Sequence, residues 1–311
     1  MRDLNNIFFL IFLFLSFLLF ILIMTKNQKT SQQKEAFTQP QNFVIKTDEN
    51  VYDEFYSQFY DNLFLPEVKN RYIVEKAFLI TQPDIHKSSI LDVGSGTGEL
   101  LRCLKENGFQ HMYGLDKSSA MITTCMAKNP SIFVKEGDAE DTPLLFEKNK
   151  FTHLFCVEMT IYEIRNKITF FRNVHYWLKN NGYLFLHLVD PNKFNTIVPA
   201  GEPAFIQELA SSSRSIQELV PERILNTDID FKDFQYRSSY DFSRTPTVFK
   251  ETFTDNKSFK IRKNTKQMYF EGVDEILAHA RYCGFLPVGQ IDFRKCNGDK
   301  YQHIFILERL H

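Results

Sequence analysis

The stretch ILDVGSGTG, residues 90–98, decides the fold of this chain. Its first four residues are apolar apart from Asp92, which is typical of a strand buried in a sheet. Three alternating glycines follow, and glycine allows positive φ angles and a close approach of the backbone to a ligand. An apolar helix is expected to begin near Leu100. A strand, a glycine-rich turn and a helix in this order can cradle a nucleoside, but several classes of nucleotide-binding protein share this arrangement.

Working outward from this loop, short apolar runs alternate with helical segments as far as the C-terminus. This alternation predicts a parallel sheet with helices on both faces. The last two runs predict an antiparallel hairpin, and Asn181-Gly182 and Cys283-Gly284 are interpreted as helix ends. The expected strands lie at about 88–93, 111–116, 131–135, 151–157, 182–189, 285–292 and 302–309, and the expected helices near 98–107, 118–128, 166–179 and 272–283.

Residues 52–80 precede the first strand and predict two short helices that are broken near Pro66. Three tyrosines of this segment, Tyr52, Tyr56 and Tyr60, have two interpretations. They could pack against the edge of the sheet, or one of them could help to close a ligand pocket.

Two acidic residues follow the loop at the ends of later strands. Asp116 closes the second expected strand, about 20 residues beyond the loop, where a carboxylate can accept both hydroxyl groups of a ribose. Asp138 follows the third expected strand, and ligands of open α/β sheets bind at this carboxyl edge. A carboxylate there can accept the amino group of adenine. The order of the loop and the two acids predicts an adenosine ligand without phosphate groups.

Each acid also has a structural interpretation. Asp92 could order the loop by accepting its backbone amides. Asp116 could be an ordinary N-cap of the helix that follows Lys117. Both interpretations stay open for the single residues, whereas the spacing and order of the set favour ligand binding.

On these motifs the chain resembles the class I S-adenosylmethionine-dependent methyltransferase family over about residues 50–311. The matching segments are ILDVGSGTG, YGLDKSSAM, VKEGDAED and WLKNNGYLFLHL. The resemblance implies an α/β fold with a doubly wound, seven-stranded, mostly parallel sheet, and S-adenosylmethionine as the cofactor. It implies cofactor contacts from Asp92, Gly94, Gly96 and Gly98 at the methionyl part, Asp116 at the ribose, and Asp138 with Ala139 at the adenine, with Ser95, Thr97, Lys117 and Val157 completing the set.

A dinucleotide-dependent dehydrogenase is the nearest alternative enzyme, because it also uses a strand, a glycine-rich turn and a later acid. Its GxGxxG pattern would need glycine or alanine at position 99, where this chain has Glu99. A carboxylate beside a pyrophosphate is electrostatically unfavourable. The cofactor of a methyltransferase carries a sulfonium and no phosphate, so Glu99 favours the methyltransferase.

The methyl acceptor is expected above the carboxyl ends of the fourth and fifth strands. Glu158, Tyr162 and His187 are the catalytic candidates there, together with Asp190, because a base is needed if the acceptor loses a proton. Each of them could instead pair with loop backbone. The amino-methylating branch of the family often carries an Asn-Pro-Pro-Tyr-like motif at this point, and this chain has EMTI at 158–161. That departure argues against methylation of the amino groups of nucleic acid bases.

An insertion of about 80 residues, 191–270, separates the fifth strand from the next helix. It predicts a lid with extra strands, such as Thr247 to Phe253 and Ser258 to Ile261. Over residues 231–266, nine Lys or Arg oppose four Asp or Glu, with aromatic residues between them. This composition could bind phosphate groups and stacked rings, as in single-stranded RNA or a phospholipid headgroup. It could equally form a solvated flap whose aromatic residues pack on the sheet.

The N-terminus predicts a membrane anchor. Residues 7–24 form an apolar run, with Ser16 as the only polar member, that is long enough to cross a bilayer once. A cleavable signal peptide is the alternative, but no small-x-small cleavage site follows the run. Three lysines do follow it, and the positive-inside rule then places the rest of the chain in the cytosol. We expect a flexible tether over residues 25–49 and a cytosolic methyltransferase domain over residues 50–311.

Composition adds little about partners. The formal net charge of -1 gives no global attraction to nucleic acid, which is a less favoured partner for that reason. The five cysteines form no CxxC pair and have no histidine at ligand spacing, so no metal site is expected. Their scattered apolar positions predict buried thiols.

The sequence as a whole predicts methyl transfer to a small-molecule or lipid-associated acceptor near a membrane, because an anchor raises the effective concentration only of substrates at the same surface. Two alternatives stay open. The first is a non-catalytic scaffold with the methyltransferase fold at a membrane, and the second is a methyltransferase that acts on RNA or protein.

Overall fold

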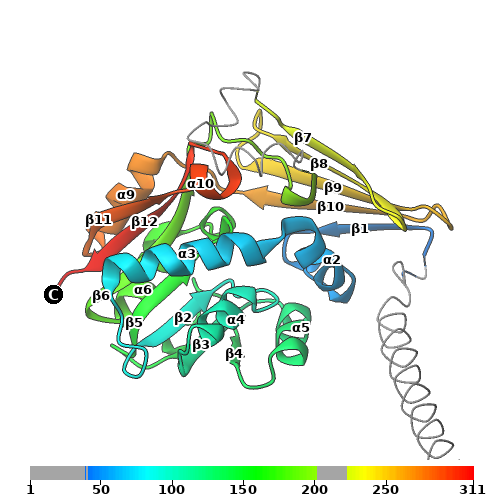
Figure 1. Cartoon of the computed structure of the whole chain (residues 1–311). Coiled ribbons are helices and arrows are strands. Elements are labelled where there is room, and N and C mark those ends of the chain that lie inside the picture. Colours follow the sequence, from blue (N-terminus) through cyan, green and yellow to red (C-terminus); the bar gives the residue numbers. More distant parts are fainter. Residues whose placement is uncertain (1–38, 40, 202–222) are drawn as a thin grey trace, which may run out of the picture. The chain divides into compact units, whose positions relative to one another are not determined.

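A seven-stranded sheet forms the centre of the computed structural model, which describes residues 39, 41–201 and 223–311 (Figure 1). Residues Gln41–His311 belong to one compact unit. The strands of the sheet are β2 (Ser89–Val93), β3 (His111–Asp116), β4 (Phe133–Glu136), β5 (Phe151–Cys156), β6 (Leu178–Val189), β11 (Phe285–Asp292) and β12 (Gln302–Arg309). Their order is β11-β12-β6-β5-β2-β3-β4.

The sheet is mixed, and one strand reverses its direction. Strands β4, β3, β2, β5 and β6 pair in parallel, whereas β12 is antiparallel to both of its neighbours, β6 and β11. The prediction of a mostly parallel sheet that closes with an antiparallel hairpin is therefore confirmed.

Helices cover both faces of this sheet because neighbouring residues of a buried strand point to opposite sides. On one face, Ile90 of β2 packs with residues of α3 (Pro66–Thr81) and α4 (Glu99–Glu106). On the other face, Leu91 packs with residues of α6 (Lys167–Trp177) and α9 (Val273–Tyr282). The remaining helices are α2 (Glu54–Phe64), α5 (Ser119–Lys128) and the short α10 (Arg294–Asn297), with 3-10 turns at η1 (Asp48–Val51), η2 (Pro143–Leu145), η3 (Thr160–Tyr162) and η4 (Pro199–Gly201).

Most element predictions are confirmed, including the break between α2 and α3 at Pro66 and the helix end at Gly284, which has a φ of +88°. The helix end predicted at Asn181-Gly182 is wrong. Helix α6 ends at Trp177, and β6 begins at once because Leu178 already pairs with Phe151 of β5.

A second sheet has the order β1-β10-β9-β8-β7 and forms the lid. Its strands are β1 (Phe43–Thr47), β7 (Asn226–Asp230), β8 (Phe234–Asp241), β9 (Thr247–Asp255) and β10 (Ile261–Met268). The prediction of a strand from Thr247 is confirmed. The strand predicted for residues 258–261 is wrong, because Phe259 has a φ of +56° in a turn and β10 begins only at Ile261.

The lid also takes a strand from the segment that was expected to be a tether. Residues 43–47 pair in parallel with β10 from Ile261 to Thr265, so the flexible tether predicted as far as residue 49 is wrong for this part. The alternating pattern of FVIKT suits a strand at the edge of a sheet. The expected anchor at 7–24 and the tether up to residue 38 lie outside the described residues. In the part of the chain that is described, no helix combines the length and apolarity needed to cross a membrane.

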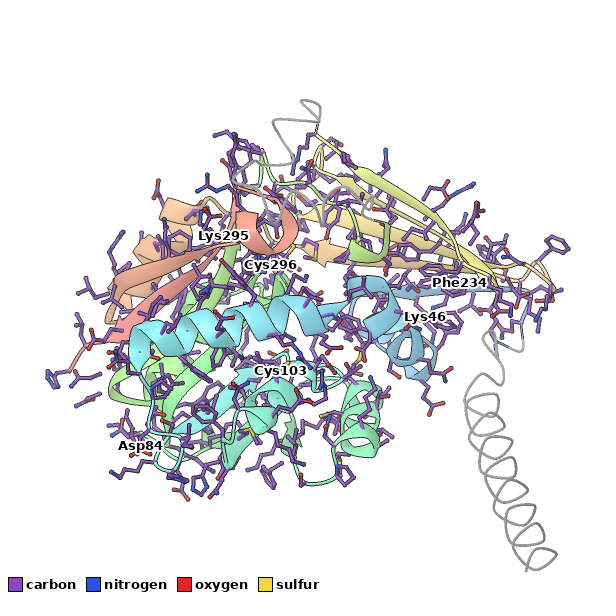
Figure 2. The ribbon with its side chains drawn as sticks, viewed as in Figure 1. Lys46, Asp84, Cys103, Phe234, Lys295 and Cys296 are labelled. Carbon is purple, nitrogen blue, oxygen red and sulfur yellow. The ribbon has the colours of Figure 1, made fainter. Side chains whose placement is uncertain are left out.

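The lid packs on α2 through aromatic side chains. Phe59 of α2 contacts Phe234 of β8 with ring centroids 4.8 Å apart, and Phe55 contacts Phe253 of β9 at 5.4 Å. Figure 2 shows Phe234 on this sheet. These contacts support the interpretation of the lid aromatics as packing residues. The cysteines form no disulfide among the described residues. Cys103, Cys125 and Cys156 are buried as predicted, whereas Cys283 and Cys296 are only half-buried.

Candidate active site

Two adjoining pockets lie at the carboxyl end of the parallel strands. We call the first the loop pocket, since it is bordered by Gly94, Gly96 and Asp116, and its volume with its open mouth is about 740 Å³. The second, the lid pocket, is about 870 Å³ in the same measure and lies beneath residues of β8, β9 and β10. The two pockets share four lining residues, Tyr52, Tyr60, Glu158 and Glu163.

The glycine-rich loop is fixed onto the end of β3. The backbone amides of Gly94 and Ser95 donate to the Leu115 carbonyl, at 2.8 and 3.1 Å. The Gly96 amide donates to Asp116 Oδ2 at 2.7 Å, and the Ser118 amide donates to Asp116 Oδ1 at 2.9 Å. Asp116 therefore orders the loop and also lines the loop pocket. The N-cap of α5 is Ser118 and not Asp116.

Two glycines of the loop have different tasks. A Cβ added at Gly96 would meet only the Tyr60 ring, at 4.0 Å, so this backbone faces open space at the pocket. A Cβ at Gly98 would lie 2.3 Å from the Cys125 sulfur, so Gly98 lets α4 and α5 pack together. Gly98 does not line the pocket, contrary to its predicted contact with the cofactor.

Four other residues predicted to bind the cofactor also lie off the pocket wall, namely Asp92, Ser95, Thr97 and Val157. Thr97 Oγ1 donates to Asp61 Oδ1 at 2.5 Å. Ser95 is buried beneath the loop, where its hydroxyl lies close to Gly114. Val157 is buried, and its carbonyl accepts the Thr160 amide. The side chains of Thr97, Ser95 and Val157 thus support the loops. The other predicted residues line the loop pocket, namely Gly94, Gly96, Asp116, Lys117, Asp138 and Ala139.

Asp92 is buried under the loop with only 2% of its surface exposed. Its Oδ1 atom has no hydrogen-bond partner among the described residues. Burial raises the pKa of Asp92 well above its usual range, and repulsion from Asp116 and Glu158 raises it further. A cationic group bound nearby would lower this repulsion.

The lining of the loop pocket is mostly negatively charged. Of the described residues that line it, five are acidic and one is basic, namely Asp116, Asp138, Glu140, Glu158, Glu163 and Lys117. Phosphate groups would be repelled by such a wall, whereas a sulfonium or an ammonium group would be attracted.

The far side of the loop pocket is held by α6. Asn173 Nδ2 donates to the carbonyls of Ala139 and Glu140, at 2.7 and 2.8 Å. Asp138 Oδ1 accepts the Glu140 amide at 2.8 Å, which shapes the turn after β4. The Asp138 side chain therefore borders the pocket from a fixed position.

The comparisons with known proteins agree with this geometry. Residues 90–182 match the family model described as a methyltransferase domain. The chain thus carries a methyltransferase domain. S-adenosylmethionine is its cofactor, and the acidic wall, the unpartnered Asp92 oxygen and the open backbone at Gly96 fit this phosphate-free cation. No curated protein matches the sequence.

Solved structures share the fold at low sequence identity. The methyltransferase CcbJ from Streptomyces caelestis is 15% identical, with a TM-score of 0.60 over 85% of this chain and 100% of that one. A S-adenosylmethionine-dependent methyltransferase from Clostridium acetobutylicum is 15% identical, with a TM-score of 0.59 over 82% and 98%. The sugar N-methyltransferase KedS8 from Streptoalloteichus is 17% identical, with a TM-score of 0.57 over 82% and 93%.

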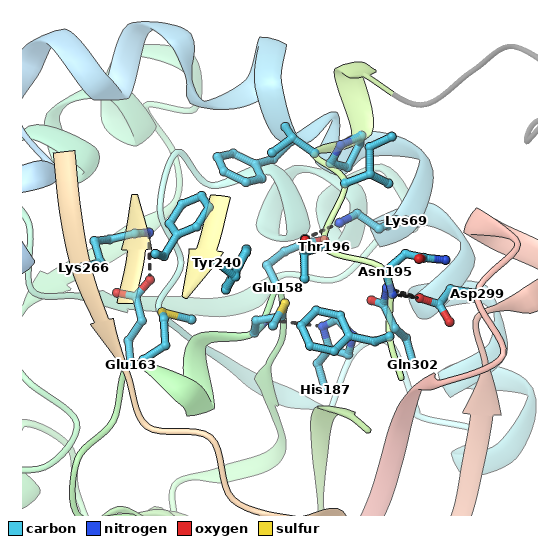
Figure 3. A pocket seen from close by; sticks show the side chains of 18 of the residues that line it. Lys69, Glu158, Glu163, His187, Asn195, Thr196, Tyr240, Lys266, Asp299 and Gln302 are labelled. Carbon is cyan, nitrogen blue, oxygen red and sulfur yellow. Dashed lines mark hydrogen bonds and ion pairs between the residues drawn. The ribbon is translucent and has the colours of Figure 1, made fainter. Parts of the chain in front are cut away.

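Glu158 stands where the two pockets of this methyltransferase meet. It follows β5 with a φ of +51°, and Met159 has a φ of +66°, so two non-glycine residues adopt the left-handed conformation at the end of the strand. Backbone strain of this kind persists where the surrounding structure enforces it. Glu158 Oε2 lies 2.5 Å from Lys69 Nζ of α3, and this ion pair orients the carboxylate (Figure 3).

The other two catalytic candidates have different surroundings. His187 of β6 lines the lid pocket, and burial, together with the nearby Lys69 charge, lowers its pKa to about 3. Tyr162 is fully buried and lines neither pocket. Its hydroxyl accepts the Val189 amide at 2.8 Å and donates to the Val189 carbonyl at 3.2 Å. The structure thus gives Tyr162 a role in packing, which replaces the predicted catalytic one. Asp190 caps a turn, since its Oδ1 accepts the Asn192 amide.

A buried ion pair joins the lid to the wall between the pockets. Lys266 Nζ of β10 donates to Tyr52 Oη at 2.6 Å and to Glu163 Oε1 at 3.1 Å, and Tyr52 donates to the same carboxylate. Burial acts to raise the pKa of Glu163, but the Lys266 charge and the Tyr52 hydrogen bond outweigh it, so the pKa is lowered. Glu163 is therefore ionised and fixed beside both pockets.

Of the three tyrosines with open interpretations, Tyr52 and Tyr60 line both pockets. Tyr56 is buried, and its hydroxyl donates to Glu251 of the lid at 2.9 Å. Several further pocket residues had no signal in the sequence that pointed to a site, namely Lys69, Asn195, Lys266, Asp299 and Gln302. Glu163 could have been found, because it lies in the same loop after β5 as Glu158.

Proposed function

We propose that this methyltransferase acts on a small-molecule acceptor that binds in the lid pocket. The observation that supports the proposal most is the shared wall: a molecule in the lid pocket would meet the contents of the loop pocket at Glu158. The wall of the lid pocket combines aromatic rings with a few polar groups, as small-molecule sites do. Aromatic side chains supply much of the wall, including Phe64, Phe194, Tyr240 and Phe249.

Glu158 is the group that we propose to receive a proton from the acceptor. S-adenosylmethionine, when bound, supplies an electrophilic methyl group on a sulfonium. The acceptor would form its new bond to this methyl carbon while the electron pair of the carbon–sulfur bond remained on sulfur, and the proton of the acceptor would go to the Glu158 carboxylate. Lys69 holds that carboxylate at the boundary of the pockets, and correct positioning accounts for a large part of the rate of such a displacement.

A polymer acceptor is less well supported. Stacking on single-stranded RNA would need a row of exposed aromatic rings, whereas Phe234 and Tyr236 of the lid are buried. Of the aromatic residues in the described lid segments, only Phe43 and Phe259 are largely exposed. Arg262 and Lys266 of the same sheet are buried in ion pairs with Asp53 and Glu163. An amino pentose methyltransferase from Micromonospora echinaspora shares the fold with a TM-score of 0.56, at 14% identity, and its named substrate class is compatible with this proposal.

Membrane attachment through residues 7–24, with residues 50–311 in the cytosol, stays a prediction from the sequence. It is tested by alkaline carbonate extraction of membranes from cells that express the full chain or a chain without residues 1–38. We expect the full chain to stay in the membrane pellet and the shortened chain to leave it. Recovery of the full chain in the supernatant would refute the anchor.

The acceptor class is tested by incubating the full chain with S-adenosylmethionine that carries a labelled methyl group and with a cell extract separated into small-molecule, lipid, protein and RNA fractions. We expect label in the small-molecule fraction and about a hundredfold less with Glu158→Gln, the range for a lost general base. Label in lipid would identify a lipid-associated acceptor instead. Label in protein or RNA would contradict the proposal, and binding of cofactor without any transfer would support the scaffold alternative.

A further inference from the structure

Two buried nitrogen atoms at the lid pocket lack hydrogen-bond partners within the described part of the chain. They are His187 Nε2 and Asn195 Nδ2, on residues that are 2% and 6% exposed. Both residues line the pocket (Figure 3). Buried polar atoms are nearly always paired in native proteins, so each unpaired one calls for a reason, such as a catalytic or binding role.

His187 presents a proton donor to the pocket. The Met159 amide donates to its Nδ1 at 3.2 Å, and a ring nitrogen that accepts a hydrogen bond carries no proton. The neutral ring therefore holds its proton on Nε2. The Gln302 side chain lies near the ring, where hydrogen bonding acts to raise the pKa of His187, yet Nε2 has no partner with hydrogen-bond geometry among the described residues. Since burial keeps the pKa of His187 near 3, the ring is neutral and stays a donor across the physiological pH range.

Asn195 presents a second donor, and its orientation is fixed from two sides. Its Oδ1 accepts the Ile224 amide at 3.1 Å, so the unpaired end of the side chain is the NH₂ group. Its backbone amide donates to Asp299 Oδ2 at 2.8 Å. Asp299 also accepts from Gln302 Nε2 at 3.0 Å, which ties the loop after β6 to the start of β12.

We propose that His187 Nε2 and Asn195 Nδ2 form a subsite for an uncharged oxygen of the methyl acceptor, a hydroxyl or a carbonyl. The inference rests on the proposed function and deepens it by naming a chemical group of the acceptor. Two N–H donors select an atom with lone pairs, which excludes an ammonium group. The carboxylate of Asp299 lines the same pocket, so a carboxylate or phosphate of the ligand would meet a like charge.

The subsite would act by positioning. His187 holds the Met159 amide, and Met159 is the neighbour of Glu158 in the strained turn after β5. Through this link, an oxygen bound to His187 is held in a fixed position relative to the Glu158 carboxylate, which receives the proton. His187 and Asn195 are thus positioning residues of this site, while Glu158 faces the reacting group.

The test uses four ring compounds that differ in a single group: cyclohexanol, cyclohexanone, cyclohexanecarboxylate and cyclohexylamine. Each is added to the full chain saturated with S-adenosylhomocysteine, and its dissociation constant is measured by ligand-observed NMR. We expect the alcohol or the ketone to bind about threefold to tenfold more tightly than the two charged compounds, the effect of one or two net hydrogen bonds. Tighter binding of the carboxylate or the amine, or equal binding of all four, would overturn the proposal.

Matched variants locate the effect. His187→Phe and Asn195→Asp each remove one donor and should abolish the preference for the uncharged oxygen. His153→Phe and Asn129→Asp are the controls, because each of these residues is buried with an unpaired nitrogen but lines neither pocket. Loss of the preference in the controls, or its survival in both subsite variants, would refute the assignment.

Folding and function are checked separately. Binding of S-adenosylhomocysteine shows whether each variant keeps its loop pocket. If one subsite variant fails this check, the other variant and the ranking of the four compounds by the wild type still test the subsite. The ranking needs no turnover. Absence of label in every small molecule would therefore refute the proposed function, whereas a wrong ranking would refute only the subsite.

Discussion

The loop pocket and the lid pocket lie side by side, yet they are built in different ways. Apart from Tyr52 and Tyr60, the loop pocket comes from one stretch of chain, residues 93–164, in which successive strands end beside each other. The lid pocket draws on residues from Tyr52 to Gln302 and on both sheets. In the loop pocket, backbone amides already satisfy Asp116, whereas the lid pocket keeps two unpaired donors. The loop pocket is therefore formed by local structure, whereas the lid pocket is assembled from distant parts of the chain.

The largest expected effect concerns the loop pocket. Asp116→Ala removes the acceptor of the Gly96 and Ser118 amides and the predicted ribose contact. We expect binding of S-adenosylhomocysteine, measured by calorimetry, to weaken about a hundredfold or more, since hydrogen bonds to charged groups are the stronger ones.

The control for this change is Asp84→Ala. Asp84 also shapes a turn by accepting a backbone amide, that of His86, but it lies on the surface away from the loop pocket. The affinity of the Asp84→Ala variant for S-adenosylhomocysteine should equal that of the wild type. Unchanged affinity of Asp116→Ala would remove the role of this residue and with it the contrast between the two pockets.

The next effect concerns the buried ion pair of Lys266 and Glu163, which lies between the pockets. Lys266→Met leaves the buried Glu163 carboxylate without its cation, and breaking a buried pair costs about 3 kcal/mol. We expect that loss in the free energy of unfolding by urea denaturation. Arg237→Met on the same sheet breaks an exposed pair with Asp228 and should cost under about 1 kcal/mol. Equal losses of unfolding free energy in the two variants would show that the Lys266–Glu163 pair does not act as a buried electrostatic contact.

A smaller effect separates chemistry from binding. Glu158→Gln keeps the size of the side chain but removes the proton acceptor, so we expect methyl transfer to slow about a hundredfold, the lower end of the range for a general base. Affinity for S-adenosylhomocysteine should change by less than about threefold, because one neutral hydrogen bond at most is exchanged. A strong loss of affinity with an unchanged rate would assign Glu158 to the loop pocket alone.

The smallest effect is the absence of a titration. Because burial and the Lys69 charge lower the pKa of His187 to about 3, its ring should bind no proton between about pH 5 and pH 8. The NMR signal of its ring Cε1 proton should stay constant over that range. A midpoint near 6.5 for His187 would mean that it is open to solvent, and the permanent donor in the lid pocket would be lost.

The methyltransferase fold and half of its site could be predicted from the sequence, because each depends on local order. Strands and helices follow from periodicity, and Gly96, Asp116 and Asp138 come to one edge because parallel strands end there. The sequence failed at Leu178, where pairing with β5 overrides the expected helix end, and at residues 43–47, where β10 supplies partners that no local pattern reveals.

Sequence alone therefore determined the strand, the loop and the acidic residues that line the loop pocket. Only the tertiary structure decided which of the catalytic candidates line a pocket: it buried Tyr162, placed Glu158 between the two pockets and left His187 Nε2 without a partner among the described residues. The physical reason is that hydrogen-bond satisfaction and burial are set by neighbours that lie far away in the chain. Lys69, Asn195 and Lys266 acquire their roles only when α3, the loop after β6 and the lid sheet meet around one cavity.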